Sequence, residues 1–81
     1  MAVTVPPGLE DVLSIDPEIM HGKVCFKGRR LMLTVLLDNL KDGMSVDEFV
    51  EEYEANRDQV MAVVAWQAHE MRRTMGIEYE D

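Results

Sequence analysis

The chain has 81 residues, enough for one domain, and a formal net charge of −8 at pH 7. That charge argues against a general nucleic-acid or anionic-membrane binder, because both need a positive field. One cysteine cannot form an internal disulfide, and the N-terminus lacks the basic segment and apolar stretch of a secretion signal. The longest apolar run, residues 60–66, is too short to span a bilayer. We therefore expect a cytoplasmic protein.

The charges are distributed unevenly along the chain. Residues 1–22 carry −4, 23–30 carry +4, 45–58 carry −5 and 78–81 carry −3. A positive strip between acidic blocks is suited to docking onto a partner of mixed charge, so the pattern favours a binding module over an enzyme. Ordinary solubilising surface charge is the plainer interpretation. We call the four cations of residues 23–30 the basic strip: Lys23, Lys27, Arg29 and Arg30.

The N-terminal third predicts a loose segment followed by short strands. Residues 1–12 are expected to form a loose lead-in, because Pro6-Pro7-Gly8 is a turn signal. The next region, residues 13–33, is expected to form a β-hairpin. Gly28 permits a tight turn, after which residues 31–33 are expected to return as a strand.

One further turn is expected inside the hairpin region. Asp16-Pro17 has the form of a cap followed by proline at the first helical position, so a helical turn through Met20 is predicted. Gly22 ends that turn, and strand character follows in residues 24–27.

Three helices are expected over residues 34–75, where the hydrophobic period becomes helical. Gly43 is placed to end the first helix. Ser45 and Glu48 form a capping box for the second helix, expected over about residues 46–53.

A second capping box, Asn56 with Gln59, opens the longest helix, expected over about residues 57–74. Residues 76–81 are expected to be an acidic tail. The predicted fold class is mostly α, with a short N-terminal β-hairpin followed by a three-helix, helix-turn-helix-like bundle.

The third helix carries more apolar surface than two short neighbours can cover. One predicted stripe contains Val60, Val63, Val64, Ala68 and Met71. Met61, Ala65 and Trp66 widen it. Because helices that are hydrophobic most of the way round are buried, we expect a second copy or another protein to pack on these three residues. The same surface is compatible with an oligomeric scaffold.

No catalytic residue, cofactor site or metal site is predicted. Cys25 with His21 or His69 offers a nucleophile and a base, but a lone cysteine in a strand is far more often a small buried hydrophobe. These three residues are too few for a structural zinc site, and no Gly-rich phosphate loop is present. We therefore expect a protein that is not an enzyme.

DNA binding is an alternative that the helical arrangement leaves open. The second helix would carry its acidic face toward phosphates, so electrostatics excludes it as the reading helix. The start of the third helix offers Asn56, Arg57 and Gln59, whose side chains are able to contact base edges. A transcriptional autoregulator would use these residues, with phosphate contacts from the basic strip.

The segment from Asp16 to Leu31 resembles the signature of a small prokaryotic family, the domain of unknown function 433 family. The usual form of that signature is Asp-Pro-(four residues)-Gly-Lys-Pro-x-Ile-Lys-Gly-Thr-Arg-Ile. The helical part is similar too, through Gly43-Met44-Ser45, Glu48 and Tyr53. The chain departs from the family pattern at three places: Val24 for proline, Arg29 for threonine, and Tyr53-Glu54-Ala55-Asn56 for Tyr-Pro-x-Leu.

The resemblance implies a hairpin followed by three helices, often dimeric, and an antitoxin role typically directed at a PIN-like ribonuclease toxin. A toxin of that kind gathers carboxylates around a metal, so an intruding cation would neutralise its active site. We therefore expect an inhibitor that forms a homodimer and binds a cognate toxin. The predicted partner-binding residues are the basic strip together with Arg72 and Arg73.

Overall fold

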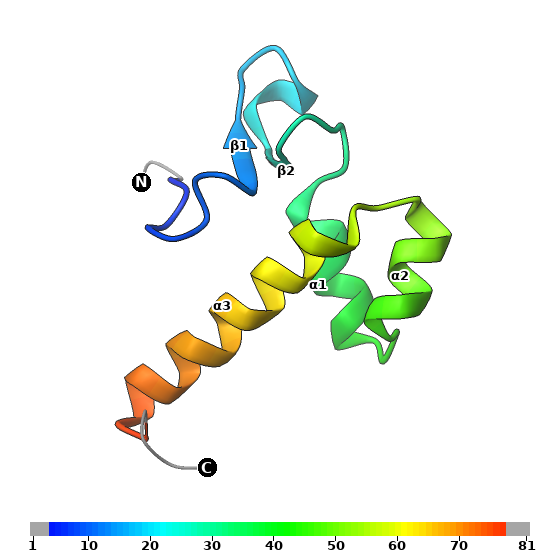
Figure 1. Ribbon diagram of the computed structural model, residues 1–81. Coiled ribbons are helices and arrows are strands. Elements are labelled where there is room, and N and C mark those ends of the chain that lie inside the picture. The colour runs from blue at the N-terminus through cyan, green and yellow to red at the C-terminus, as the bar shows by residue number, and fades with distance from the viewer. Residues whose placement is uncertain (1–3, 78–81) are drawn as a thin grey trace.

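The computed structural model describes residues 4–77 and contains three α-helices and a two-stranded antiparallel hairpin (Figure 1). The elements, including one short 3₁₀ turn (η1), are β1 (Leu13–Ile15), η1 (Met20–Gly22), β2 (Val24–Phe26), α1 (Leu33–Lys41), α2 (Val46–Tyr53) and α3 (Arg57–Met75). The predicted fold class is confirmed. Among residues 4–77, no helix has the length and apolar character needed to cross a membrane.

The hairpin is made by β1 and β2, with Ser14 opposite Cys25. The predicted returning strand at 31–33 was wrong: it contributes only one isolated bridge, between Met32 and Cys25. The reason is that α1 begins at Leu33 and takes the following backbone groups into helical hydrogen bonds. Cys25 is buried at the middle of this arrangement.

The connection between the strands contains a left-handed turn. Met20, His21 and Gly22 have φ angles of 50°, 56° and 80°. Glycine adopts such angles freely, whereas the two L side chains each cost roughly 1–2 kcal/mol. The predicted right-handed turn forms only over residues 16–19, where an Asp16 carboxylate oxygen accepts the Glu18 N–H and the Asp16 carbonyl accepts the Ile19 N–H, both at 2.9 Å. It does not continue through Met20, where the left-handed turn begins.

The core lies where the hairpin and the first turns of α3 meet α1 and α2 (Figure 1). Its buried side chains are Leu9, Leu13, Phe26, Leu36, Phe49, Val60 and Val63. Leu36, Phe49 and Val60 are each 0% exposed. These three come from α1, α2 and α3, so each helix places one fully buried side chain at the same centre.

Part of the predicted loose lead-in belongs to this core. Leu9 is 3% exposed, and its carbonyl accepts the Leu13 N–H at 2.9 Å. The backbone N–H groups of Glu10 and Gly8 bond the Glu10 carboxylate and hold the pKa of that carboxyl below its ordinary value. The prediction was therefore wrong for residues 8–12, because a single anchoring leucine gives no periodic signal in the sequence. Residues 1–3 lie outside the described part.

The predicted capping box of Ser45 with Glu48 is confirmed, whereas the box predicted for Asn56 with Gln59 forms only its Asn56 half, because the Gln59 side chain bonds the Lys27 carbonyl instead. Ser45 Oγ accepts the Glu48 N–H, and a Glu48 carboxylate oxygen accepts the Ser45 N–H, both at 3.1 Å. Asn56 Oδ1 accepts the Gln59 N–H at 3.1 Å and opens α3. α3 ends at Gly76, which has a φ of 76°. Most of the predicted acidic tail, residues 78–81, lies outside the described residues.

Replacing Glu54 with glycine is expected to raise the free energy of unfolding by about 0.5–1 kcal/mol. Glu54 ends α2 with φ 51° and ψ 40°, a left-handed conformation that costs an L residue more than glycine. Urea unfolding measures the change. In the matched control, Glu52→Gly in the exposed interior of α2, stability falls by about 1 kcal/mol. A Glu54→Gly variant less stable than the parent would contradict this explanation.

Candidate partner-binding surfaces

The side chains of the basic strip do not form one surface. Lys27 Nζ donates a hydrogen bond to the carbonyl of Glu10 at 3.1 Å. Arg29 donates from its guanidinium to the carbonyl of Glu54, at the end of α2. These two bonds attach the loop after β2 to the lead-in on one side and to α2 on the other. The side chains of Lys27 and Arg29 therefore stabilise the fold, a role that the sequence did not predict.

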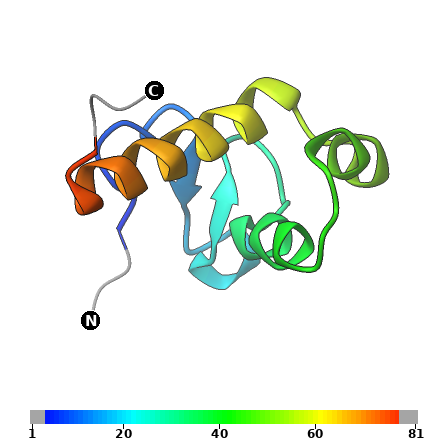
Figure 2. The same cartoon turned by 90° about the horizontal axis from the view of Figure 1, so that it is seen from below.

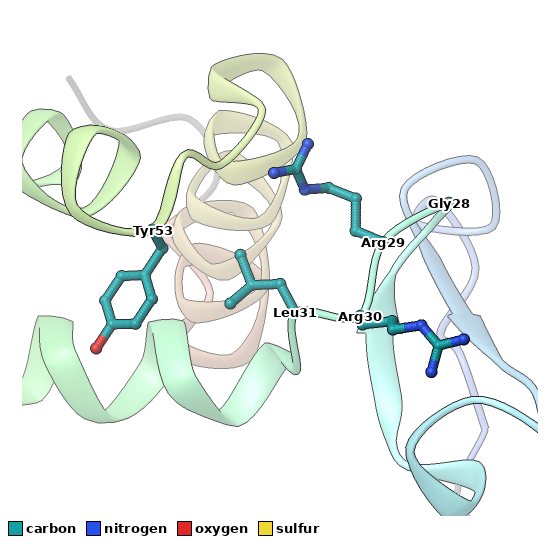
Figure 3. A pocket seen from close by; sticks show the side chains of 5 residues that line it. All are labelled: Gly28, Arg29, Arg30, Leu31 and Tyr53. Carbon is teal, nitrogen blue, oxygen red and sulfur yellow. The ribbon is translucent and has the colours of Figure 1, made fainter.

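The two neighbouring arginines point to opposite sides of their loop (Figure 3). They border an open hollow whose lining residues are Gly28, Arg29, Arg30, Leu31 and Tyr53. Arg29 reaches toward the turn between α2 and α3, whereas Arg30 extends away from Tyr53 (Figure 3). Arg30 is exposed and has no hydrogen bond or ion pair to any residue in the described range 4–77. Of the two, Arg30 is the side chain free to enter a partner.

Lys23 borders a different hollow, between η1 and α1. This hollow has a volume of about 480 Å³ and is lined by His21, Gly22, Lys23, Val24, Leu33, Thr34 and Leu37. Lys23 is exposed at its rim, above apolar side chains from β2 and α1. A partner that engages Lys23 would therefore also meet apolar surface.

The two predicted cations of α3 lie far from the hairpin. Gln59, at the start of α3, donates from its side-chain amide to the carbonyl of Lys27 at 2.9 Å. At about 1.5 Å of rise per residue, Arg72 lies roughly 20 Å further along the helix. Arg73 forms an ion pair with Glu70 at 2.7 Å, and its hydrogen bond holds the pKa of the Glu70 carboxyl below its ordinary value. The six predicted cations therefore cannot all enter one acidic site.

The three side chains predicted to read DNA are all engaged within the chain. Asn56 caps α3 through its side-chain oxygen, and Arg57 forms an ion pair with Asp47 at 2.5 Å. The Gln59 amide nitrogen bonds the carbonyl of Lys27, and its Oε1 is buried. Base readout would require these contacts to be exchanged, and Gln59 is the least available of the three.

The outer side of α3 is apolar and uncovered by any described element. Figure 2 shows α3 along one edge of the molecule, with the strands and α1 all on the same side of it. We call the apolar residues along its less covered side the outer stripe: Met61, Val64, Ala65, Ala68, Met71 and Met75. Val64 is half-buried, and Met71 lies at the margin of the stripe, where it also borders an open hollow with Trp66. Met61, Met71 and Met75 are 43%, 62% and 65% exposed, and both alanines are exposed. The buried residues of α3 are confined to its first two turns, at Val60 and Val63.

Trp66 lies on the inner side of α3 instead. Its indole N–H donates to the carbonyl of Pro7 at 3.3 Å, and Gly8 lies against the ring. The chain's own lead-in therefore covers part of Trp66, which is half-buried, and its role in a partner interface stays a prediction. Ala68 and Met71, which belong to the same predicted stripe as the buried Val60 and Val63, are exposed. Met61 and Ala65 are exposed, as a contact surface requires.

Metal-binding side chains are scattered across the described residues. Over residues 4–77, no group of three His, Cys, Asp or Glu side chains is close enough together to hold a metal ion. His21 is exposed on the left-handed turn, while Cys25 is buried in β2.

The family profile of DUF433, described as a protein of unknown function, matches residues 13–66, two-thirds of the chain. The chain belongs to this family. The match runs from β1 into the middle of α3, so it covers the hairpin, α1 and α2, while the outer end of α3 lies beyond it. No curated protein and no solved structure matches the chain.

Two of the positions at which this DUF433 chain departs from the usual pattern are in contact. Arg29, which stands where threonine is usual, bonds the carbonyl of Glu54, which stands where proline is usual. Proline cannot adopt the Glu54 φ of 51°, because its ring holds φ near −65°. A proline at position 54 could therefore not form the turn between α2 and α3 as it stands here, and Arg29 stabilises this turn.

Proposed function

We propose that this DUF433 protein is a non-catalytic binding module that forms a homodimer and inhibits a PIN-like ribonuclease toxin. The observation that carries the proposal is the outer stripe of α3, which leaves a long apolar helix face unprotected. Three methionines on that face, Met61, Met71 and Met75, are 43%, 62% and 65% exposed.

The acidic face of α2 supports an interaction with a protein that binds RNA. Its exposed carboxylates are Asp47, Glu48, Glu51 and Glu52. A ribonuclease presents basic surface to its substrate, so a row of carboxylates on one helix face complements it in charge. Screened rim charges of this kind act mainly on the rate of association and on specificity.

Arg30 is the cation that we assign to the toxin's acidic centre. It is exposed, it borders the same open hollow as Leu31 and Tyr53 while its guanidinium extends away from Tyr53, and its side chain has no hydrogen bond or ion pair within residues 4–77 (Figure 3). Arg29 holds the end of α2 instead, so its loss acts on stability. Of these two adjacent residues, Arg30 has the inhibitory role and Arg29 the structural one.

Co-expression with the product of the adjacent open reading frame tests the proposal, with copurification and ribonuclease inhibition as readouts. Arg30→Glu is expected to weaken inhibition at least about tenfold without changing the unfolding midpoint, because an exposed charge is reversed at the contact. Lys41→Glu, an exposed reversal on α1, is the matched control and retains inhibition. Full inhibition after simultaneous reversal of Lys23, Arg30 and Arg72 would remove the role of these cations.

The other functions make different predictions. DNA autoregulation requires binding to the chain's own promoter that weakens steeply with salt, and no contact of Asn56, Arg57 or Gln59 favours it. A scaffold would show an intact homodimer with no copurifying toxin. The copurification experiment therefore separates the inhibitor from the scaffold.

A further inference from the structure

We infer that the outer stripe of α3 pairs with the outer stripe of a second copy in the antiparallel direction, with the two helices crossing near Ala65. The inference rests on the proposed function only in taking α3 as the contact between copies. Its content is the set of residues that meet and the direction in which the two chains run.

The spacing of the outer stripe is that of a helix-pairing seam. Met61, Val64, Ala68, Met71 and Met75 follow one another at intervals of three, four, three and four residues. Such heptad spacing keeps one line of apolar side chains facing a partner helix along its whole length. None of these five residues is charged, so a second helix meets no charge that it would have to bury.

The sizes of the side chains suit a crossing at the middle of α3. Ala65 and Ala68 are small, and small residues at the contact let helix axes approach toward the shorter end of the usual range, about 8 Å. In an antiparallel crossing near Ala65, Met61 of one copy lies opposite Met71 of the other, and Val64 lies opposite Ala68. The flexible methionines then fill the space at both ends. The surface is self-complementary, as a two-fold interface requires.

Charge decides the direction of pairing. Asp58 and Arg72 lie on the same edge of the outer stripe, each seven residues from Ala65. Both are exposed, and neither side chain has an ion pair or hydrogen bond to another of residues 4–77. Antiparallel pairing brings Arg72 of each copy to Asp58 of the other, whereas parallel pairing opposes like charges at both ends. Flanking charges of this kind set the orientation of paired helices.

The fold leaves room for this partner. Figure 1 shows the C-terminal half of α3 extending past α1 and α2, and in Figure 2 no helix or strand of residues 4–77 lies on the outer side of α3. α3 has 19 residues and is therefore about 28 Å long. An isolated helix of the length of its projecting part would be only marginally stable in water, so a second helix would stabilise this part.

Cysteine cross-linking of the full chain, without any toxin, tests the pairing. Met61→Cys and Met71→Cys are each expected to give little covalent dimer alone, and to give abundant dimer when the two variants are co-expressed and oxidised. His69→Cys, exposed on another side of α3, is the matched control and should not cross-link with either. Efficient cross-linking of each single variant to itself would show parallel pairing and overturn the inference.

The flanking charges provide an independent measurement. Arg72→Glu should weaken dimerisation on the order of tenfold, because two attractions become two repulsions. The double variant Asp58→Arg with Arg72→Glu should restore most of the affinity. A parent chain that is monomeric by light scattering at every concentration would overturn the seam. Neither measurement uses a toxin. The pairing of α3 can therefore be confirmed even if no toxin copurifies, and a toxin can copurify even if the pairing is disproved.

Discussion

Phe49→Ala is expected to lower the free energy of unfolding by about 3–5 kcal/mol. Phe49 is 0% exposed, it packs in the core with Leu36 and Val60, and its ring centroid lies 4.7 Å from that of Tyr53. Folded domains have total stabilities of only about 5–15 kcal/mol, and a domain this small belongs near the lower end. The variant should therefore be largely unfolded at 25 °C.

Urea unfolding followed by circular dichroism measures this loss, at one fixed protein concentration because self-association adds to apparent stability. Glu52→Ala, exposed on the same helix, is the control and should change stability by less than about 0.5 kcal/mol. An unchanged midpoint for Phe49→Ala would mean that α2 does not close the core.

The helix boundaries could be predicted because the residues that set them are local. Ser45 with Glu48, and Asn56 with Gln59, satisfy free backbone N–H groups within one turn of the chain, so their spacing alone reports the helix start. Gly76 likewise ends α3 by adopting a conformation that other residues avoid. None of these signals depends on tertiary contacts, and all appear in the structure where the sequence placed them.

The faces of α3 could be predicted only in part. Helical periodicity predicts which side chains share a face of the helix. It does not predict which part of that face the other elements of the protein cover. Trp66 and Met71 illustrate the limit: both were assigned by period, and the lead-in covers the first while nothing described covers the second. The partner of β2 was missed for a similar reason, because strand pairing is a long-range property.

The division of labour in the basic strip could not be predicted. The side chains of Lys27 and Arg29 both donate hydrogen bonds to backbone carbonyls. Every residue has a backbone carbonyl, so the sequence does not indicate which one will be the acceptor. Arg29 and Glu54 are 25 residues apart along the chain. Without the fold, all four cations are equally free, so their charge was the only property on which to assign a role.

Leu9→Ala is the second change with a large expected effect, about 2–5 kcal/mol of lost stability, because it removes a buried side chain from the core. Leu9 is 3% exposed, and the segment around it is tied to the body by three further bonds. Those bonds join Trp66 to Pro7, the Lys27 side chain to Glu10, and the Lys27 N–H to the Val12 carbonyl at 2.8 Å. Losing the Leu9 side chain should weaken all three hydrogen bonds together.

The single tryptophan makes this loss directly visible. Trp66 is half-buried against Pro7 and Gly8, so its fluorescence should shift toward that of a water-exposed indole in Leu9→Ala at low urea, before the helices unfold. Thr4→Ala, an exposed change in the same segment, should leave both the emission and the midpoint unaltered. Two results together would show that the segment is not packed on α3. The tryptophan of the parent protein would already emit as an exposed indole, and Leu9→Ala would change neither the emission nor the unfolding midpoint. The inner side of α3 would then be as open as the outer stripe, and a partner would have two faces to choose from.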